Sequence, residues 1–145
     1  MKKKWWIAIL TGLCACFMSL AFVACGGEKE MGQASLIMEL SADESYYIVT
    51  GVENKDCTEI VIPKEYNGKP VKKIGNNAFK DCSSLTSIEI PGSVTSIGDG
   101  SFIFCSSLTS IEIPDSVTSI GHGAFAYCDS LTGVYITDLE AWCSI

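Results

Sequence analysis

The strongest feature of the sequence is an internal repeat. The segment from Ile74 to Pro91 returns from Ile97 to Pro114, and returns more loosely from Ile120 to Ile136. One spacing separates the equivalent cysteines, phenylalanines and leucines: Cys82, Cys105 and Cys128; Phe79, Phe102 and Phe125; Leu85, Leu108 and Leu131. A period in the twenties with a fixed apolar pattern is typical of a solenoid with one coil per repeat.

Each repeat has an extended half and a turning half. The extended half, from Leu85 to Ile90, ends in alternation of apolar and polar residues, which predicts a strand with one buried side. Pro91 ends the strand because proline cannot donate to the ladder. In the turning half we expect a short helical turn from Asp99 to Cys105. No coil can bury its apolar residues alone, so the coils are expected to stack at about 4.8 Å.

At these residues the chain resembles the BspA-type leucine-rich repeat of bacterial surface proteins. The shared pattern is Leu-x-x-Ile-x-Ile-Pro-x-x-Val-x-x-Ile-x-x-x-x-Phe-x-x-Cys, and the resemblance covers about residues 45–145. It implies a leucine-rich-repeat solenoid of about 23 residues per coil, with a parallel β-sheet on one face and short helical turns on the other. It also implies a non-catalytic surface protein that adheres to a host or a neighbouring cell.

The N-terminal segment 1–24 differs from everything that follows it. A short basic stretch precedes an uncharged run, Trp5–Ala24, as in a secretory signal. Phe22-Val23-Ala24-Cys25 resembles the lipobox of bacterial lipoproteins, in which the cysteine is acylated and the chain is cut before it. The usual leucine of that motif is Phe22 here. The alternative is an uncleaved anchor that spans the bilayer. Both interpretations predict an exported, membrane-anchored protein at the bacterial cell surface.

The chain is therefore expected to have four parts. They are a lipoprotein signal peptide (1–24), a flexible tether (25–35), an N-terminal cap coil (36–70) and the leucine-rich repeats (71–145). The repeat pattern breaks after Ile136, and members of the resembled family usually run on for further coils. We therefore expect the sequence to be truncated at its C-terminus.

The charge of the chain excludes one class of partner. After the signal, seven lysines remain against 17 acidic residues, and the chain has no arginine. Nucleic-acid binders need basic patches that displace counterions from phosphate. We therefore expect no nucleic-acid partner.

The cysteines of the repeat are expected to form a buried ladder with the phenylalanines and leucines at the other repeat positions. Zinc sites need paired cysteines at short spacing, and none are present. Equivalent side chains on stacked coils run parallel, so they do not converge as a disulfide requires. Cysteine is also among the most buried residue types. The sequence predicts no metal site.

A glycine motif near the end of the repeats has a structural interpretation. Residues 121–126 read Gly-His-Gly-Ala-Phe-Ala, which matches a dinucleotide-binding fingerprint. The equivalent segments of the other coils show that its glycines serve a turn. His122 occupies a slot that holds Asp99 and Asn76 in the other coils, which predicts an exposed polar position. We expect neither a cofactor nor a catalytic residue here.

The outward positions of the predicted strands are the candidate binding face. They are Ser87, Glu89, Thr109, Ser110, Glu112 and Tyr135. Like charges at strand spacing cost some stability, which makes this face a candidate binding or cation-attracting surface. For these residues by themselves we favour the simpler interpretation, a solvated face that keeps the sheet soluble. The sequence as a whole still predicts a module that binds a protein or glycan ligand. Two alternatives remain: a passive envelope spacer, or the N-terminal fragment of a longer surface protein whose activity, enzymatic activity included, lies downstream.

The lipobox interpretation predicts that Cys25 becomes the acylated N-terminal residue of the mature protein. Mass spectrometry of membrane-extracted protein should find a lipid-modified Cys25, and Cys25→Ser should release or mislocalise the protein. Recovery of an intact chain from Met1 onwards in the membrane would favour the uncleaved anchor instead.

Overall fold

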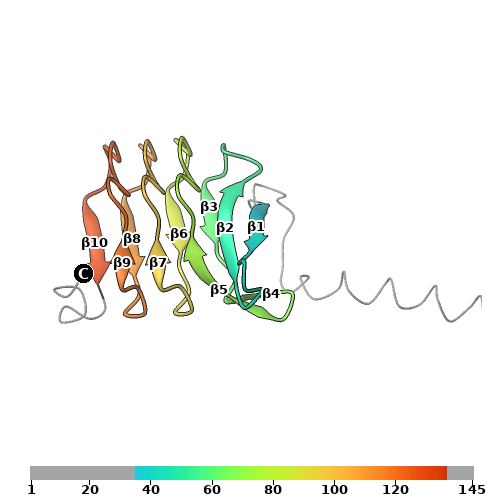
Figure 1. The fold of residues 1–145 in the computed structure, drawn as a ribbon. Coiled ribbons are helices and arrows are strands. Elements are labelled where there is room, and N and C mark those ends of the chain that lie inside the picture. Colours follow the sequence, from blue (N-terminus) through green and yellow to red (C-terminus); the bar gives the residue numbers. More distant parts are fainter. Residues whose placement is uncertain (1–34, 137–145) are drawn as a thin grey trace, which may run out of the picture. The chain divides into compact units, whose positions relative to one another are not determined.

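The computed structural model describes residues 35–136 of the chain. They form a β-solenoid of about four turns, with about 23 residues per turn (Figure 1). The strands in chain order are β1 (Leu36–Leu40), β2 (Tyr47–Val52), β3 (Glu59–Val61), β4 (Glu65–Tyr66), β5 (Lys69–Ile74), β6 (Ser87–Glu89), β7 (Ser96–Ile97), β8 (Ser110–Ile113), β9 (Ser119–Ile120) and β10 (Gly133–Ile136). Within residues 35–136, no helix is long and apolar enough to cross a membrane.

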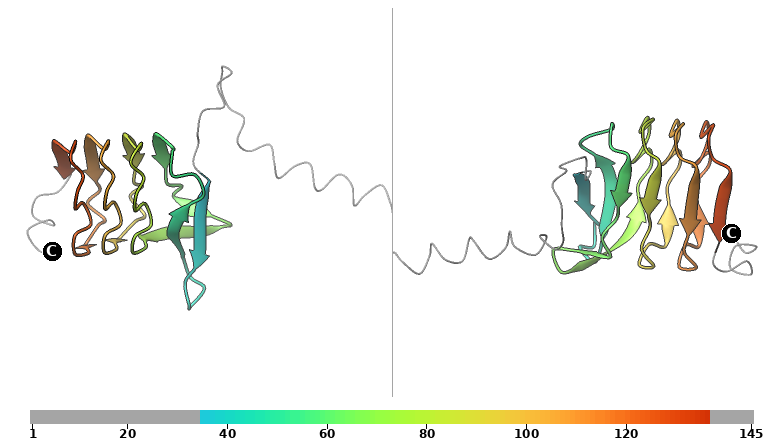
Figure 2. Two further views of the ribbon diagram at one scale, coloured as in Figure 1. Left: turned by 90° about the horizontal axis from the view of Figure 1, so that it is seen from above. Right: turned by 180° about the vertical axis from the view of Figure 1, so that it is seen from behind.

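Parallel strands line two sides of the solenoid. On one side β2, β5, β7 and β9 follow one another in a single sheet. On the other side β3 pairs with β6, and β8 pairs with β10. The register places Ile74 beside Ile97, and Ile97 beside Ile120. Figure 2 shows the coils side by side in one row. The sequence predicted one sheet face, and the structure adds a second set of short parallel strands.

The N-terminal end of the solenoid is less regular than the rest. Strand β1 pairs with β2 in antiparallel orientation, and β4 forms a second antiparallel pair with β5. The division of the chain into signal, tether, cap coil and repeats stays a prediction. Residues 1–34 and 137–145 lie outside the described residues, and with them lie the predicted signal peptide, Cys25 and the end of the repeat region.

The predicted short helical turns are not present, since residues 35–136 contain no helix. Consecutive turns take the place of the helical turns. Along these turns the backbone N–H groups donate alternately to a carbonyl of the same coil and to a carbonyl of the next coil. The N–H groups of Ala78, Lys80 and Cys82 bond within their own coil. Those between them donate to the next coil: Asn77 to the Asp99 oxygen (2.9 Å), Phe79 to the Ser101 oxygen (2.8 Å) and Asp81 to the Ile103 oxygen (3.0 Å).

This alternation explains why the segment cannot be a helix. In a helix each N–H donates to the carbonyl four residues back in the same segment. Here every second N–H donates to the neighbouring coil instead. The backbone is also left-handed at Asn77 and Asp81, with φ of 57° and 64°. Such residues interrupt a right-handed helix.

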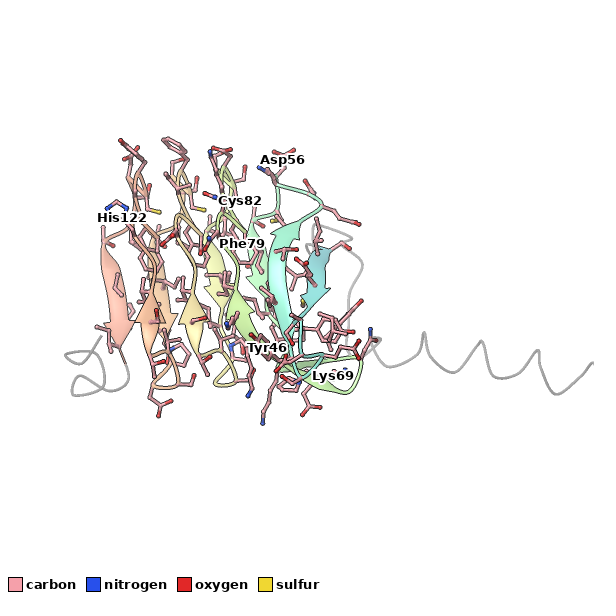
Figure 3. The ribbon with its side chains drawn as sticks, viewed as in Figure 1. Tyr46, Asp56, Lys69, Phe79, Cys82 and His122 are labelled. Atoms are coloured by element: carbon pink, nitrogen blue, oxygen red, sulfur yellow. The ribbon has the colours of Figure 1, made fainter. Side chains whose placement is uncertain are left out.

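The core consists of side chains stacked in columns from coil to coil. The rings of Phe79 and Phe102 lie 5.3 Å apart between centroids, and the rings of Phe102 and Phe125 lie 5.3 Å apart as well. Phe79, labelled in Figure 3, and Phe102 have no exposed surface. Leu85 and Leu108 are equally buried, and the isoleucines of the strands pack beside them. Each coil therefore completes the core of its neighbours.

Glycine is required where one coil touches the backbone of the coil before it. A Cβ atom added to Gly98 would lie 2.7 Å from the backbone nitrogen of Asn76. At the equivalent Gly121 it would lie 2.4 Å from the backbone nitrogen of Asp99. Backbone atoms held by inter-coil hydrogen bonds cannot move away cheaply.

We predict that Gly98→Ala destabilises the fold by about 1–3 kcal/mol, the usual cost of overpacking. Gly92→Ala is the matched control, because nothing lies within 4 Å of its added Cβ atom. Its effect should stay within about 0.5 kcal/mol, as at most surface positions. Urea unfolding of both variants measures the difference, and equal effects would contradict this packing.

Candidate binding surface

The predicted binding face lies on the outer side of β6, β8 and β10. Side chains alternate along these strands. Ile88 and Ile111 are buried, and the residues directly before and after each of them are exposed. Ser87 and Glu89 are exposed on β6, Ser110 and Glu112 on β8, and Tyr135 on β10. Tyr135 is 64% exposed. Thr109, directly before β8, is exposed as well.

Strand register arranges these side chains in rows across the coils. Glu112 pairs with Tyr135 across β8 and β10. Glu89 pairs with Val61 across β6 and β3. Strand β6 lies next to β8 in the stack of coils (Figure 1). Val61, Glu89, Glu112 and Tyr135 therefore form one row, which we call the strand-face row.

Val61 is a member of this row that the sequence analysis missed. Its side chain is 51% exposed, and it stands two residues before a proline, as Glu89 and Glu112 do. That spacing was visible in the sequence. The longer connection after Pro63 obscured the equivalence, because it breaks the regular spacing of the repeat.

The threonine row beside it has a structural role. The hydroxyl and the N–H of Thr86 both donate to the Thr58 carbonyl oxygen, at 2.9 and 2.8 Å. Thr132 donates to the Thr109 oxygen in the same way, at 3.3 and 2.9 Å. The carbonyl of Thr109 is thus occupied by the next coil, so this predicted site residue contributes to coil stacking.

Charge is unevenly distributed along the solenoid. The lysines of the described residues all lie between Lys55 and Lys80, and every charged side chain from Asp81 to Ile136 is acidic. No lysine follows Lys80, so Glu89 and Glu112 lie in the part of the sequence where every charged side chain is acidic. The strand-face row is suited to cationic or uncharged polar groups of a ligand.

The cysteines of the predicted ladder lie in the core. Cys82, labelled in Figure 3, and Cys105 have no exposed surface, and Cys128 is partly buried. The Cys105 thiol donates to the Phe79 carbonyl oxygen at 3.2 Å, and the Cys128 thiol donates to the Phe102 oxygen at 3.1 Å. All three thiols are free, as is that of Cys57. Burial raises the pKa of Cys82 to about 11 and that of Cys105 to about 12.

The remaining ladder residues follow the same columns. Leu85 and Leu108 are fully buried, whereas Phe125 and Leu131 are partly buried against the core. No group of three or more His, Cys, Asp or Glu side chains within residues 35–136 could hold a metal ion.

The slot of His122 carries a chain of hydrogen bonds between coils. The Asn76 side-chain oxygen accepts a bond from the Asp99 N–H at 2.9 Å. The Asp99 carboxylate accepts the equivalent bond from the His122 N–H at 2.7 Å. His122 itself is exposed at the last described turn segment (Figure 3). Asn76 and Asp99 therefore hold the stacked coils together.

Two exposed aromatic residues were not anticipated from the sequence. Phe104 and Tyr127 stack with ring centroids 4.8 Å apart and planes 16° apart, and they are 42% and 64% exposed. Both have left-handed backbones, with φ of 64° and 58°. Two aromatic residues one repeat apart, at a slot that holds Asp81 in the first regular coil, were the available signal.

The energetics of this aromatic pair are unfavourable for the fold. Left-handed backbone at a non-glycine residue costs on the order of 1–3 kcal/mol. Two such residues therefore cost about 2 kcal/mol or more, whereas one aromatic stack contributes about 0.5–1.5 kcal/mol. The stack does not offset the backbone cost.

Comparison with known proteins identifies the repeat. The family model described as "BspA type Leucine rich repeat region" matches residues 52–141 in six copies. A leucine-rich repeat protein from Bacteroides capillosus has a similar solved structure, with a TM-score of 0.52 and 22% identity over 76% of this chain and 98% of that one. This likeness supports the fold alone.

Two further solved structures are more distant. A leucine-rich repeat protein from Bacteroides ovatus is 24% identical, with a TM-score of 0.47 over 75% of this chain and 41% of that one. The T. pallidum leucine-rich repeat protein is 23% identical, with a TM-score of 0.44 over 68% of this chain and 67% of that one. No curated protein matches the chain.

We predict that the thiols of Cys82 and Cys105 resist alkylation in the native protein, even at a pH of about 9–10. Their raised pKa keeps them protonated, and burial keeps the reagent away. Labelling in urea should be fast, which provides the control. Cys105→Ala should cost on the order of 1 kcal/mol through a small cavity, and Cys105→Asp far more. Rapid native labelling or a disulfide-linked peptide would contradict the ladder.

Proposed function

The chain belongs to the BspA-type leucine-rich repeat family, and from this we propose that it is a bacterial cell-surface protein that binds a protein or glycan ligand. Proteins of this family are typically found at the surface or are exported. The proposed binding site is the outer face of β3, β6, β8 and β10. The proposed role is non-catalytic.

One observation carries the proposal: exposed side chains stand in a regular row on a backbone fixed by inter-strand hydrogen bonds. Glu112 and Tyr135 are paired across β8 and β10, and Glu89 pairs with Val61 across β6 and β3. Binding to such a row costs less conformational entropy than binding to flexible loops, because the protein backbone is already ordered. Extended solenoid faces are generally used for recognition.

The chemistry of the row indicates how it would bind. Tyr135 offers a large, exposed ring of the kind that anchors many interfaces. Glu89 and Glu112 offer carboxylates in the part of the sequence after Lys80, which contains no lysine or arginine. Basic or hydroxyl-bearing groups of a ligand would satisfy these carboxylates, whereas phosphate polymers would be repelled.

Export and membrane attachment complete the proposal. The apolar run Trp5–Ala24 followed by Cys25 supports a lipoprotein signal, with an uncleaved anchor as the alternative. The proposed lipid or signal anchor would hold the solenoid at the membrane.

The alternative function is a passive envelope spacer, or a fragment of a longer surface protein whose activity lies downstream. A spacer needs the stacked core but places no demand on the strand-face row. The two functions therefore differ in whether a saturable ligand exists.

We predict that Glu112→Ala combined with Tyr135→Ala weakens ligand binding at least tenfold while the fold survives, because both side chains are exposed. Asp115→Ala is the matched control, since it removes an exposed carboxylate from the connection after β8. Ligands would first be sought by screening the protein against host matrix proteins, glycans and whole cells. Surface plasmon resonance then gives the affinities.

Two outcomes would contradict the proposal. Absence of saturable binding in the whole screen would favour the spacer. Equal loss of affinity in Asp115→Ala and in the double variant would place the contact away from the strand-face row.

A further inference from the structure

Phe104 and Tyr127 lie at the tips of two successive turn segments, away from the strand-face row. We call them the aromatic ridge. We propose that the aromatic ridge binds a neutral polysaccharide, by stacking of its rings against the C–H faces of sugar rings. This inference rests on the proposed binding role, and it assigns a second site and a ligand class to that role.

The first argument is the backbone conformation that the ridge occupies. Each regular coil has two left-handed positions in its turn segment. The first position holds Asn77, Gly100 and Gly123, which are residue types that adopt this conformation easily. The second holds Asp81 and then the two aromatic residues. Bulky residues in left-handed backbone are outliers, and such outliers concentrate at functional sites.

The second argument is that the rings do not serve the core. The core column of the same turn segments is already filled by Phe102 and Phe125, whose rings stack two residues earlier in the chain. The ridge rings project outside this column, and Tyr127 is as exposed as any aromatic residue described. Exposed aromatic clusters of this kind mark interaction sites.

The third argument concerns the polar residues that come two and three positions after each ring. Ser106 and Ser107 follow Phe104, and Asp129 and Ser130 follow Tyr127. Asp129 and Ser130 are exposed, and the two serines after Phe104 are partly exposed. The threonine row and Ser110 continue these hydroxyl-bearing positions toward the strand face. Three of the four flanking side chains are uncharged hydroxyls.

This combination favours a neutral sugar polymer over other ligands. A pyranose has an apolar C–H face that packs on an aromatic ring and hydroxyls that exchange hydrogen bonds with flanking serines. An anionic polymer would need cations, and the sequence has no lysine or arginine after Lys80.

The test measures retardation of the protein in native gels that contain a soluble β-1,3-glucan, a mannan or a xylan. The ridge variants are Phe104→Asn and Tyr127→Asn, because asparagine tolerates left-handed backbone. Tyr66→Asn is the matched control, since Tyr66 on β4 and Phe104 are each 42% exposed. Tyr127→Phe retains the ring and tests whether stacking is sufficient.

We expect at least one of the three polysaccharides to retard the unmodified protein. Each ridge variant should lower its affinity tenfold or more, while Tyr66→Asn and Tyr127→Phe should bind nearly as before. The melting temperature of the ridge variants should stay unchanged or rise, because asparagine relieves the backbone cost.

Three results would overturn the inference. They are no retardation by any of the polysaccharides, an equal loss in Tyr66→Asn, and a melting temperature several degrees lower in the ridge variants, which would make the rings structural. A protein ligand that depends on Glu112 and Tyr135 but not on the ridge would leave the proposed function standing and refute this inference alone. Loss of a protein ligand in the ridge variants, with no polysaccharide bound, would give the ridge a different partner.

Discussion

Every second backbone N–H of the turn segments donates to a carbonyl of the neighbouring coil, and the parallel strands continue this exchange around the solenoid. An extra residue in one coil would shift donors away from acceptors in both neighbours. The inter-coil hydrogen bonds therefore fix the length of the repeat across the regular coils. They also explain the columns of identical side chains, since equivalent positions share one backbone conformation and one environment.

The same inter-coil hydrogen bonds make the backbone conformation at each repeat position independent of the outward side chain found there. Asp81, Phe104 and Tyr127 share a left-handed conformation although Asp81 carries a carboxylate and the other two residues carry aromatic rings. Val61, Glu89, Glu112 and Tyr135 likewise share one strand position. The ladder determines the conformation at each slot, so the outward side chains vary from coil to coil without change in the fold. Binding surfaces on this protein are consequently rows that cross several coils.

Much of the fold follows from apolar spacing alone. The buried apolar residues determine the length of the repeat. They also determine which side of the strand from Ser87 to Glu89 is buried, and they indicate that the equivalent segments of the other coils are strands. The turn segments could not be predicted in this way. Helical turns and consecutive β-turns place Phe102 inward equally well, and only the inter-coil acceptors at residues 122–126 decide between them.

The candidate surfaces could likewise be predicted only in part from the sequence. Alternation along the strands indicates that Glu112 and Tyr135 point outward, but it says nothing about backbone strain. From the sequence, the aromatic residues at 104 and 127 received no role, and only their left-handed φ values and exposed rings single them out. Asp99 reads as a simple polar residue, whereas its carboxylate accepts the His122 N–H. Interactions between coils that are distant in sequence were needed for each of these conclusions.

Under the proposed export the chain folds outside the cytoplasm, and this has a consequence for the thiols. Before folding, Cys57, Cys82, Cys105 and Cys128 are accessible to oxidants and to one another, and after folding Cys57, Cys82 and Cys105 are buried and Cys128 is partly buried. Disulfide formation takes seconds to hours, whereas turns and hairpins form within about 10 μs. Each coil packs mainly on the coils next to it, so the structure can grow by local steps. Once the coils have stacked, the free thiols of Cys82 and Cys105 have no exposed surface, so the opportunity for incorrect pairing of these cysteines is confined to the time before folding.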